Sequence, residues 1–436
     1  MTSFKFALTL IAAIWSLLPP QTQDAAQSLR VDPQRLQSRI EELAESVAAG
    51  SQGVNRLAFS QADIQGRSLV VSWMRQAGLE VRTDPAGNLI GRRPGSQPDL
   101  PPILIGSHID SVPQAGKYDG TVGVIAAIEC AQLLQENGIR TRHPLEVIVF
   151  SDEEGSMVGS RALAGDLTEG ILQMVTQSGK TVAQGLQEVG GDPQRLSEAV
   201  RGPEQVWAYL ELHIEQGGLL ESEGADIGVV EGIVAIAWWD VTVEGFANHA
   251  GTTPMDRRRD ALLAAARMIA AVNQAVKSFP GRQVGTVGRI RAEPGAPNVI
   301  PGRVVFSLEL RDLSMVTIQA MFEEIGRRSR TIQQETATRI SFTSLDATAP
   351  PALTDPEIRR TIADAARRLG LQALQMPSGA GHDAQHIARI APVGMIFVPS
   401  RGGISHSPRE YTATEDLTNG TAVLLQTLLE IDEEGS

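Results

Sequence analysis

Short apolar segments alternate with helical segments in the first half of the chain, and this alternation limits the possible folds more than any other feature. Apolar runs of strand length occupy residues 103–106, 145–150 and 208–214. A helical periodicity over residues 122–137 lies between the first two runs. Because neighbouring parallel strands need such crossovers, the pattern predicts an α/β layer with a mostly parallel sheet.

A different order of segments begins at about Val234. Strands are expected at 237–243, 284–290, 304–310 and 339–343, with helices from the Thr253-Pro254 cap to residue 276 and over 317–328. This order is typical of the small split-βαβ sandwich. A helical pattern over 355–369 then resumes the α/β character. We therefore expect a catalytic domain built from residues 27–233 and 349–436, interrupted by an inserted α+β lid over residues 234–348.

The N-terminal segment differs from the rest of the chain. Lys5 precedes an apolar run over residues 6–18, which is shorter than the roughly 20 residues that a membrane-spanning helix needs. One positive charge followed by a short apolar run is typical of a secretory signal peptide. We expect a signal peptide over residues 1–26, export to the periplasm or medium, and no stable membrane span. The alternative is an uncleaved N-terminal segment of a cytoplasmic protein.

Composition restricts the chemistry of any functional site. The formal net charge is −13, and an acidic surface repels phosphate backbones, so no nucleic-acid partner is expected. The single cysteine, Cys130, excludes a cysteine-rich zinc site and lies in an apolar helical run. No G-x-S-x-G motif occurs, so nucleophilic serine or cysteine catalysis has no support. A metal in this chain must be bound by histidines and carboxylates.

Polar motifs follow each predicted strand of the α/β layer. His108 and Asp110 follow the first strand, and Glu153-Glu154 follows the second. The carboxyl ends of parallel strands meet at one edge of a sheet, where sites of α/β proteins gather. A carboxylate at Asp110 can hold the second ring nitrogen of a metal-bound His108. Adjacent glutamates point in different directions, so one can bind a metal while the other faces a water.

Several motifs, in chain order, carry a resemblance to a known family: GSHIDSVPQAGKYDG, SDEEGSMVGSRALAG, ELHIEQG, ANHAGTTPMDRRRDAL, GAPNVIPG, LELRD, PSGAGHDA and GGISHSP. From about Arg35 to Ile431 the chain resembles the M20 metallohydrolases. It is most similar to their amidase branch, which includes N-carbamoyl-L-amino acid hydrolases, β-ureidopropionases, and allantoate and ureidoglycolate amidohydrolases. The resemblance implies two divalent metal ions per subunit, with zinc expected first and Mn, Co or Ni as alternatives. It also implies a homodimer formed through the lid.

The resemblance implies a role for each residue of the metal centre. The expected metal ligands are His108, Asp119 as the bridging carboxylate, Glu154, His213 and His406. Glu153 matches the general base, which would activate a water shared by the two metals. Peptidases of the family have a carboxylate at the position of His213, so the histidine here favours an amide or ureido substrate.

The resemblance also implies the residues that contact substrate. Gln216, Asn298 and Arg311 match positions that hold the substrate carboxylate and amide. His249 matches a catalytic lid residue that crosses the dimer interface and polarises the scissile carbonyl, and Gly381 and His382 match a further contacting pair. The expected reaction is cleavage of the ureido C–N bond of N-carbamoyl-L-amino acids or a related ureido acid. The loop after Glu154 is shorter than in typical carbamoylases, which leaves the substrate open.

Other interpretations of these residues remain. Arg311 can instead form a salt bridge to Asp312 or Glu309, and the His382…His386 pair superficially resembles a zincin helix but has Asp383 where that motif needs glutamate. The function can be that of an M20 exopeptidase or N-acyl-amino-acid hydrolase. A non-catalytic, metal-dependent binding protein would be a third possibility.

Overall fold

The computed structural model describes residues 29–45, 53–345 and 350–433, so the expected signal peptide lies outside the described residues. The described chain forms two compact units. The first contains the residues up to Gly228, together with Glu357–Leu374 and the residues from Ile390 onward. The second contains Val229–Pro356 and Gln375–Arg389. Among the described residues, no helix is both long and apolar enough to cross a membrane.

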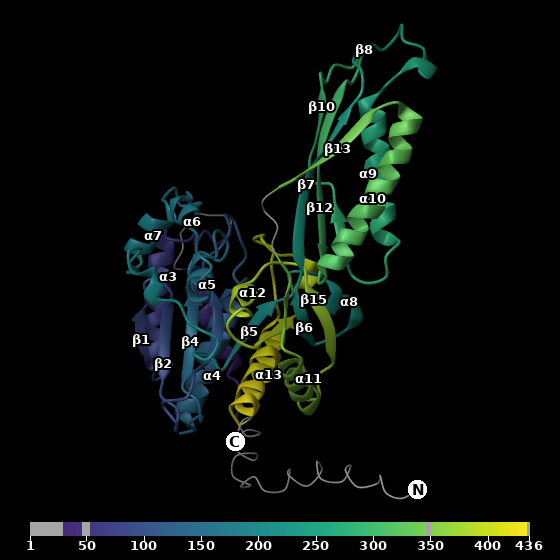
Figure 1. Cartoon of the computed structure of the whole chain (residues 1–436). Helices are drawn as coiled ribbons and strands as arrows, with labels where there is room; N and C mark the ends of the chain where they lie inside the picture. Colours follow the sequence, from purple (N-terminus) through teal and green to yellow (C-terminus); the bar gives the residue numbers. More distant parts are fainter. Residues whose placement is uncertain (1–28, 46–52, 346–349, 434–436) are drawn as a thin grey trace, which may run out of the picture. The chain divides into compact units, whose positions relative to one another are not determined.

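The first unit is built on a sheet with the strand order β1-β2-β4-β3-β5-β16 (Figure 1). Its strands are β1 (Glu80–Thr83), β2 (Leu89–Arg93), β3 (Ile103–His108), β4 (Leu145–Phe150), β5 (Ala208–Ile214) and β16 (Val393–Val398). The four strands β4, β3, β5 and β16 pair in parallel, whereas β2 pairs antiparallel with β4 and with the edge strand β1. This confirms the predicted α/β fold with a mostly parallel sheet.

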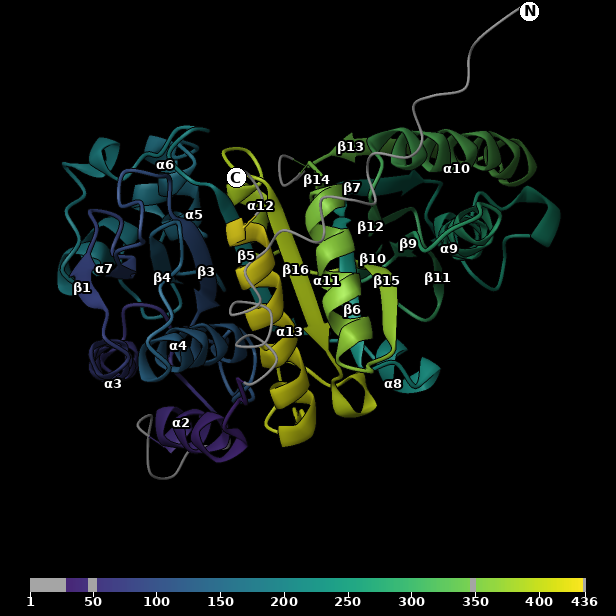
Figure 2. The same cartoon turned by 90° about the horizontal axis from the view of Figure 1, so that it is seen from below.

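Helices bury the parallel strands of this sheet. The helices of the first unit are α2 (Pro33–Glu45), α3 (Gln61–Gln76), α4 (Thr121–Glu136), α5 (Val158–Leu163), α6 (Glu169–Gln173), α7 (Val182–Glu188), α8 (Leu219–Glu223), α11 (Pro356–Arg368) and α13 (Thr414–Glu433). α4 packs against β3, β4 and β5, and α13 packs against β5 and β16 (Figure 2). Every residue of β3, β4, β5 and β16 is buried, which explains their nearly continuous apolar sequences.

The second unit contains a five-stranded antiparallel sheet with two helices. Its elements are β7 (Ala235–Glu244), α9 (Ala261–Lys277), β9 (Val284–Thr286), β10 (Ile290–Glu293), β12 (Arg303–Asp312), α10 (Met315–Thr336) and β13 (Arg339–Ser344). The strand order is β10-β12-β7-β13, with β9 also pairing with β12. α9 and α10 pack against each other and against this sheet, and their apolar faces form its core. The order of elements is that of the predicted split βαβ.

Shorter elements complete the second unit. They are β6 (Ile227–Ile233), β8 (Asn248–His249), β11 (Val299–Ile300), β14 (Ala352–Leu353), β15 (Ala373–Ser378) and α12 (Ala384–Ile387). β14 pairs antiparallel with β6, and β15 also pairs with β6. β8 and β11 form a separate two-stranded ribbon, in which His249 is paired with Val299.

Three predicted elements of the second unit are wrong at their boundaries. The helix expected over 317–328 extends from Met315 to Thr336. The helix expected to begin at Thr253-Pro254 begins at Ala261, because Asp260 caps it by accepting hydrogen bonds from the backbone N–H groups of Leu262 and Leu263. The strand expected over 284–290 is divided into β9 and β10. The division follows from the pairing, since β9 pairs with residues 309–311 of β12 and β10 with residues 303–306.

Candidate metal centre

His108 is the last residue of β3 and is buried. Its Nδ1 atom lies 3.1 Å from the backbone carbonyl oxygen of Asp110 and 3.6 Å from the Asp110 Oδ1 atom. The Asp110 carboxylate accepts hydrogen bonds from the backbone N–H groups of Glu153 and Glu154, at 3.3 and 3.1 Å. The turn after β3 therefore holds the imidazole with a carbonyl group. The Asp110 carboxylate also faces the His108 ring and in addition fixes the Glu153-Glu154 peptide.

The carboxylate of Asp119 lies between two groups of candidate ligands. Its Oδ1 atom is 3.2 Å from the His213 Nε2 atom and 3.8 Å from the His108 Nε2 atom. Its Oδ2 atom is 3.2 Å from the His406 Nε2 atom, which is 3.6 Å from the Glu154 Oε1 atom. The structure thus brings the five predicted ligands into two triads that share Asp119. The first triad is His108, Asp119 and His213; the second is Asp119, Glu154 and His406.

A glycine leaves room for the first triad. Gly120 has a φ of 64°, in the left-handed region that glycine adopts without strain. A Cβ atom there would lie 2.3 Å from the His108 Nε2 atom. The Gly120 N–H group also points at the His213 Nε2 atom, 3.2 Å away. Any other residue at this position would fill the space in front of the His108 ring.

The titratable groups of the second triad have shifted pKa values. Burial, reinforced by the charge of Asp119, raises the pKa of Glu154 to about 7. The hydrogen bond to Asp119 raises the pKa of His406 to about 9, against the effect of its burial. Burial would also raise the pKa of Asp119, but hydrogen bonds from His213 and His406 hold it well below its usual range. Glu154 and His406 therefore keep a proton at a higher pH than usual, whereas Asp119 loses its proton at a lower pH than usual.

The residues of the two triads fit a pair of divalent metal ions. In each triad, candidate ligand atoms lie within 4.8 Å of one another. Two of these atoms, His108 Nε2 and Glu154 Oε1, are buried and have no hydrogen-bond partner among the described residues. Buried polar atoms are nearly always paired, so each unpaired ligand atom indicates a missing partner. Imidazole and carboxylate donors suit Zn, Mn, Co and Ni.

Two residues of the first unit border the triads. The Glu153 Oε2 atom lies 3.5 Å from the His108 Nε2 atom. The Gln216 side-chain amide, predicted to contact substrate, donates a hydrogen bond to the Asp119 Oδ2 atom at 2.7 Å. Gln216 has a φ of 58°, and its backbone N–H donates to the Ser400 Oγ atom at 3.1 Å. Gln216 therefore contacts the shared Asp119 carboxylate directly, and Glu153 lies beside the ligand His108.

The predicted residues of the second unit form two separate groups. Asn298 lies beside His249, since its backbone carbonyl accepts a hydrogen bond from the N–H of Ala250 at 3.0 Å. Arg311 lies near the opposite end of β12 and donates through its Nη1 atom to the carbonyl of Gly379 at 2.6 Å. Asn298 precedes the first residue of β12, Arg303, whereas Arg311 is the second-last residue of this strand. Because a strand rises about 3.3 Å per residue, the length of β12 separates the two groups by roughly 25 Å.

Arg311 and His382 already have partners within the second unit. The Arg311 Nε and Nη2 atoms donate to the Glu309 carboxylate at 2.9 and 3.0 Å, which is one of the two salt bridges considered from the sequence. His382 is buried, and its Nε2 atom lies 2.8 Å from the Ser378 Oγ atom. Gly381 precedes it in the turn after β15.

Comparison with known proteins identifies the family. Residues 104–430 match the family model described as peptidase family M20/M25/M40. The chain belongs to this family. An N-carbamoyl-L-amino acid amidohydrolase of Geobacillus stearothermophilus is 42% identical over 406 residues, which cover 92% of this chain and 99% of that protein. A ureidoglycolate hydrolase of Arabidopsis thaliana is 39% identical and is matched over 93% of this chain and 88% of its own length.

Solved structures agree with these sequence relatives. The crystal structure of an amidase of the hydantoinase/carbamoylase family from Burkholderia multivorans matches with a TM-score of 0.87 and 36% identity, over 94% of this chain and 100% of that one. The chain is therefore in the amidase branch of M20, which confirms the resemblance found in its sequence. It is a hydrolase of carbon–nitrogen bonds other than peptide bonds.

Two buried residues next to the candidate metal centre could not be recognised from the sequence. Glu410 is buried and accepts hydrogen bonds from the backbone N–H groups of Tyr118 and Asp119. Arg56 is also buried and donates to the carbonyl of Ile109 at 2.5 Å and to the Thr121 Oγ1 atom at 3.0 Å. Both lie in polar segments without strand or helix periodicity, so no local pattern indicates their burial, and neither was predicted.

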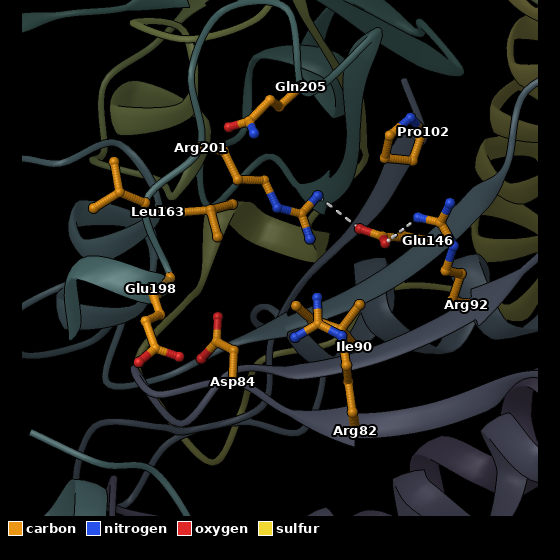
Figure 3. Close-up of a pocket in the computed structure, with 12 residues that line it drawn as sticks. Arg82, Asp84, Ile90, Arg92, Pro102, Glu146, Leu163, Glu198, Arg201 and Gln205 are labelled. Carbon is orange, nitrogen blue, oxygen red and sulfur yellow. Dashed lines mark hydrogen bonds and ion pairs between the residues drawn. The ribbon is translucent and has the colours of Figure 1, made fainter. Parts of the chain in front are cut away.

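A second cluster of buried charge lies at the other end of the parallel strands. Glu146, the second residue of β4, is bound by Arg92 at 2.8 Å and Arg201 at 2.7 Å (Figure 3). These residues line a cavity of about 300 Å³, together with Arg82, Asp84 and Glu198 among others. Burial would raise the pKa of Glu146, but the two arginines lower it below its usual value. Three arginines face three carboxylates here, so the cavity has no excess charge to attract an ion.

Proposed function

We propose that the protein is a metal-dependent amidohydrolase that cleaves the ureido C–N bond of an N-carbamoyl-L-amino acid or a related ureido acid. The observation that carries the proposal is the Asp119 carboxylate, whose two oxygens face separate triads of candidate ligands. The full-length similarity to an N-carbamoyl-L-amino acid amidohydrolase and to a ureidoglycolate hydrolase supports the substrate class.

The two triads would hold two divalent metal ions, with zinc expected first. When bound, such ions lower the pKa of a water and polarise the carbonyl that it attacks. Glu153 lies beside the first triad, 3.5 Å from His108. We assign it as the general base that takes the proton of the attacking water and delivers it to the leaving nitrogen. Gln216 would orient the substrate close to Asp119.

His249 has the hydrogen bonds that a carbonyl-polarising donor needs. Its Nδ1 atom accepts the backbone N–H groups of Gly251 and Thr252, at 3.0 and 3.2 Å. Because Nδ1 is an acceptor, the neutral ring carries its proton on Nε2. That N–H group can donate to the oxygen on which negative charge develops, and losing such a donor typically costs on the order of 10²–10³ in rate.

The separation within the second unit supports a homodimer. Arg311 would hold the substrate carboxylate, since only three of its five N–H groups are used by Glu309 and Gly379. Gly381 and His382 would contact the substrate beside it. A small ureido acid cannot reach both Arg311 and the His249–Asn298 group within one copy of the chain. We infer that residues 234–348 form a dimerisation lid and that His249 and Asn298 act from a second subunit.

A substrate panel tests the proposed reaction. Metal-loaded protein is assayed for ammonia release from N-carbamoyl-L-amino acids, N-carbamoyl-β-alanine, allantoate and ureidoglycolate, and in parallel for cleavage of N-acyl amino acids and dipeptides. Activity on a ureido acid is expected. Activity on dipeptides alone would replace the proposal with an exopeptidase, and no activity on any compound would favour a binding protein.

The variant Glu153→Gln tests the general base. It keeps the size of the side chain but cannot accept a proton, so turnover should fall by about 10²–10⁴-fold, the usual contribution of general-base catalysis. Metal content measured by atomic emission should stay at the wild-type value, since Glu153 is outside both triads. Retained activity would refute the assignment.

The location of the protein is a separate proposal. The apolar run over residues 6–18 and the preceding Lys5 support a cleaved signal peptide and export. N-terminal sequencing of the protein from its native cell is expected to begin near residue 27. An intact N-terminus in the cytoplasmic fraction would exclude export.

A further inference from the structure

Glu410 is a buried carboxylate next to the candidate metal centre, in contact with the backbone of Asp119. Its side chain is 5% exposed, and no lysine or arginine of the described residues forms an ion pair with it. It lies at the end of the segment that carries His406, four residues after that ligand. A buried carboxylate without a cationic partner is costly, so its contacts must serve the local structure.

The two oxygens of Glu410 connect two loops of the first unit. The Oε1 atom accepts hydrogen bonds from the backbone N–H groups of Tyr118, at 2.9 Å, and Asp119, at 3.2 Å. The Oε2 atom lies 2.8 Å from the Ser405 Oγ atom. That hydroxyl is in turn 3.0 Å from the Asp119 Oδ2 atom. Glu410 therefore holds Asp119 through its backbone. The Ser405 hydroxyl lies between the two carboxylates and can donate its single proton to either one.

The candidate metal centre needs Asp119 in one orientation. Each of its oxygens must face a different triad, yet the χ2 torsion of an aspartate is broad and has no sharp intrinsic preference. The contacts to Glu410 and Ser405 contribute to this restraint, together with the Gln216 amide that donates to the Asp119 Oδ2 atom. They also join the loop that carries Asp119 to the loop that carries His406, and both of these ligands belong to the second triad.

We propose that Glu410 is a positioning residue for the metal centre, which sets the orientation of Asp119 and its distance from His406. This inference rests on the proposed metal-dependent function. Because His108 and His213 lie on β3 and β5, which the sheet positions independently, the second triad should depend on Glu410 more than the first. Outer partners of metal ligands typically contribute 10–100-fold to metal affinity.

The space around Glu410 offers an independent way to move it. A Cβ atom added at Gly116 would lie 2.3 Å from both the Cβ and the Oε1 atoms of Glu410. Gly116→Ala would thus displace the carboxylate without removing it. If the position of Glu410 matters, this variant should reproduce the effect of Glu410→Gln on metal binding.

The experiment compares metal binding by full-length wild type, Glu410→Gln and a control variant. Glu129→Gln is the control, because Glu129 is a buried carboxylate of α4 that accepts a backbone N–H from Asp32 at 3.2 Å and is paired with Arg35 outside the metal centre. Its loss can lower the melting temperature but should not change metal binding. Metal-free protein is titrated with Zn²⁺ by calorimetry, and Co²⁺-loaded protein is followed by its visible spectrum. Melting temperatures are recorded for all variants.

We expect wild type and Glu129→Gln to bind two Zn²⁺ ions per subunit. Glu410→Gln should weaken one ion slightly, because Asp119 also belongs to the first triad, and the other about 10–100-fold. The contribution of the weaker site to the Co²⁺ spectrum should be reduced more than that of the other site. Ser405→Ala, which removes only the link to the Asp119 carboxylate, should weaken the same ion by a smaller factor. It also keeps the inference testable if Glu410→Gln does not fold.

Several outcomes would overturn the inference. If Glu410→Gln and Ser405→Ala bind both ions as wild type does, Glu410 only stabilises the fold, whatever the change in melting temperature. Equal weakening of both ions would contradict the link to the second triad. If wild type binds no metal, the proposed metal-dependent function fails, and this result is distinguishable from the others because it does not depend on any variant.

Discussion

Strand β4 has a buried carboxylate near its first residue and three consecutive carboxylates, Asp152–Glu154, soon after its last. Glu146 near the start is paired with Arg92 and Arg201, which lower its pKa. Glu154 beyond the end has imidazoles and Asp119 as neighbours, and its pKa is raised to about 7. Both carboxylates are shielded from water by the same sheet, so their different pKa values come from their partners.

The comparison shows how the chain separates stabilisation from ligand binding. A guanidinium group stays charged at any ordinary pH, so the Glu146 cluster is complete without a ligand. An imidazole can lose its proton near neutrality, so the cluster at the other end can exchange protons for a cation. A buried carboxylate beside histidines is therefore a better indicator of a metal site than a buried carboxylate beside arginines.

The largest expected effect comes from removing the shared carboxylate. Asp119→Asn takes one anionic ligand from both triads at once, so affinity for both metal ions should fall by more than about 100-fold, beyond the effect of losing an outer partner. Calorimetric titration with Zn²⁺ measures this. Glu146→Gln is the control and should still bind two ions. Metal loss in both variants would mean that the two ends are not independent.

The next largest effect is expected at the other end of β4. Arg201→Met leaves Glu146 buried with Arg92 as its remaining partner, and breaking a buried ion pair costs about 3–5 kcal/mol. Because Arg92 remains, we expect a loss at the lower end of this range in the free energy of unfolding, measured by urea denaturation. Metal stoichiometry should not change. If the variant is as stable as wild type but binds metal differently, the Glu146 cluster contributes to metal binding and not to stability.

The two ends should also differ in their response to pH. Protons on Glu154 and His406, with pKa values of about 7 and 9, compete with metal, so metal affinity should rise from pH 6 to 9. Each displaced proton contributes up to about tenfold per pH unit. Calorimetry in two buffers of different ionisation enthalpy counts the released protons.

The Glu146 cluster should not respond to pH between 6 and 9. Its folded-state pKa is lowered, so its contribution to stability is present above the ordinary glutamate pKa and is lost only as the pH falls through the lowered value. Between pH 6 and 9 it should contribute no pH dependence. Glu146→Gln should therefore leave the pH profile of metal affinity unchanged, and a changed profile would contradict this division.

The smallest effect is expected from Arg92→Ala. The Arg92 side chain is 39% exposed, and ion pairs in contact with water typically contribute no more than about 1 kcal/mol. Chemical denaturation should show a loss in this range, well below that of Arg201→Met. Equal losses in the two variants would show that solvent exposure does not distinguish the two partners of Glu146.

The parallel strands β3, β4 and β5 are predictable from the sequence because every residue in them is buried. β4 and β5 begin and end at the predicted residues, and the polar residues that follow a buried strand are easily recognised. The five predicted ligands follow from this pattern and from the family resemblance. The fold class and the family can therefore be inferred from the amino-acid sequence alone.

Other features depend on contacts that no local pattern indicates. Glu410 and Arg56 are buried only because distant loops fold over them. For Asp110, the choice between its carbonyl and its carboxylate as the partner of His108 depends on the shape of one turn. The true start of α9 at Ala261 is hard to predict because both Thr253 and Asp260 are suitable N-caps, and only the extended backbone at Arg258 distinguishes them.

The order of the ligands along the chain has a consequence for biosynthesis. The first triad is complete once His213 has been made, whereas the second needs His406, close to the C-terminus. A growing or truncated chain can therefore assemble at most one of the two triads. Under the proposed metal-dependent function, only a nearly complete chain can therefore offer both metal sites.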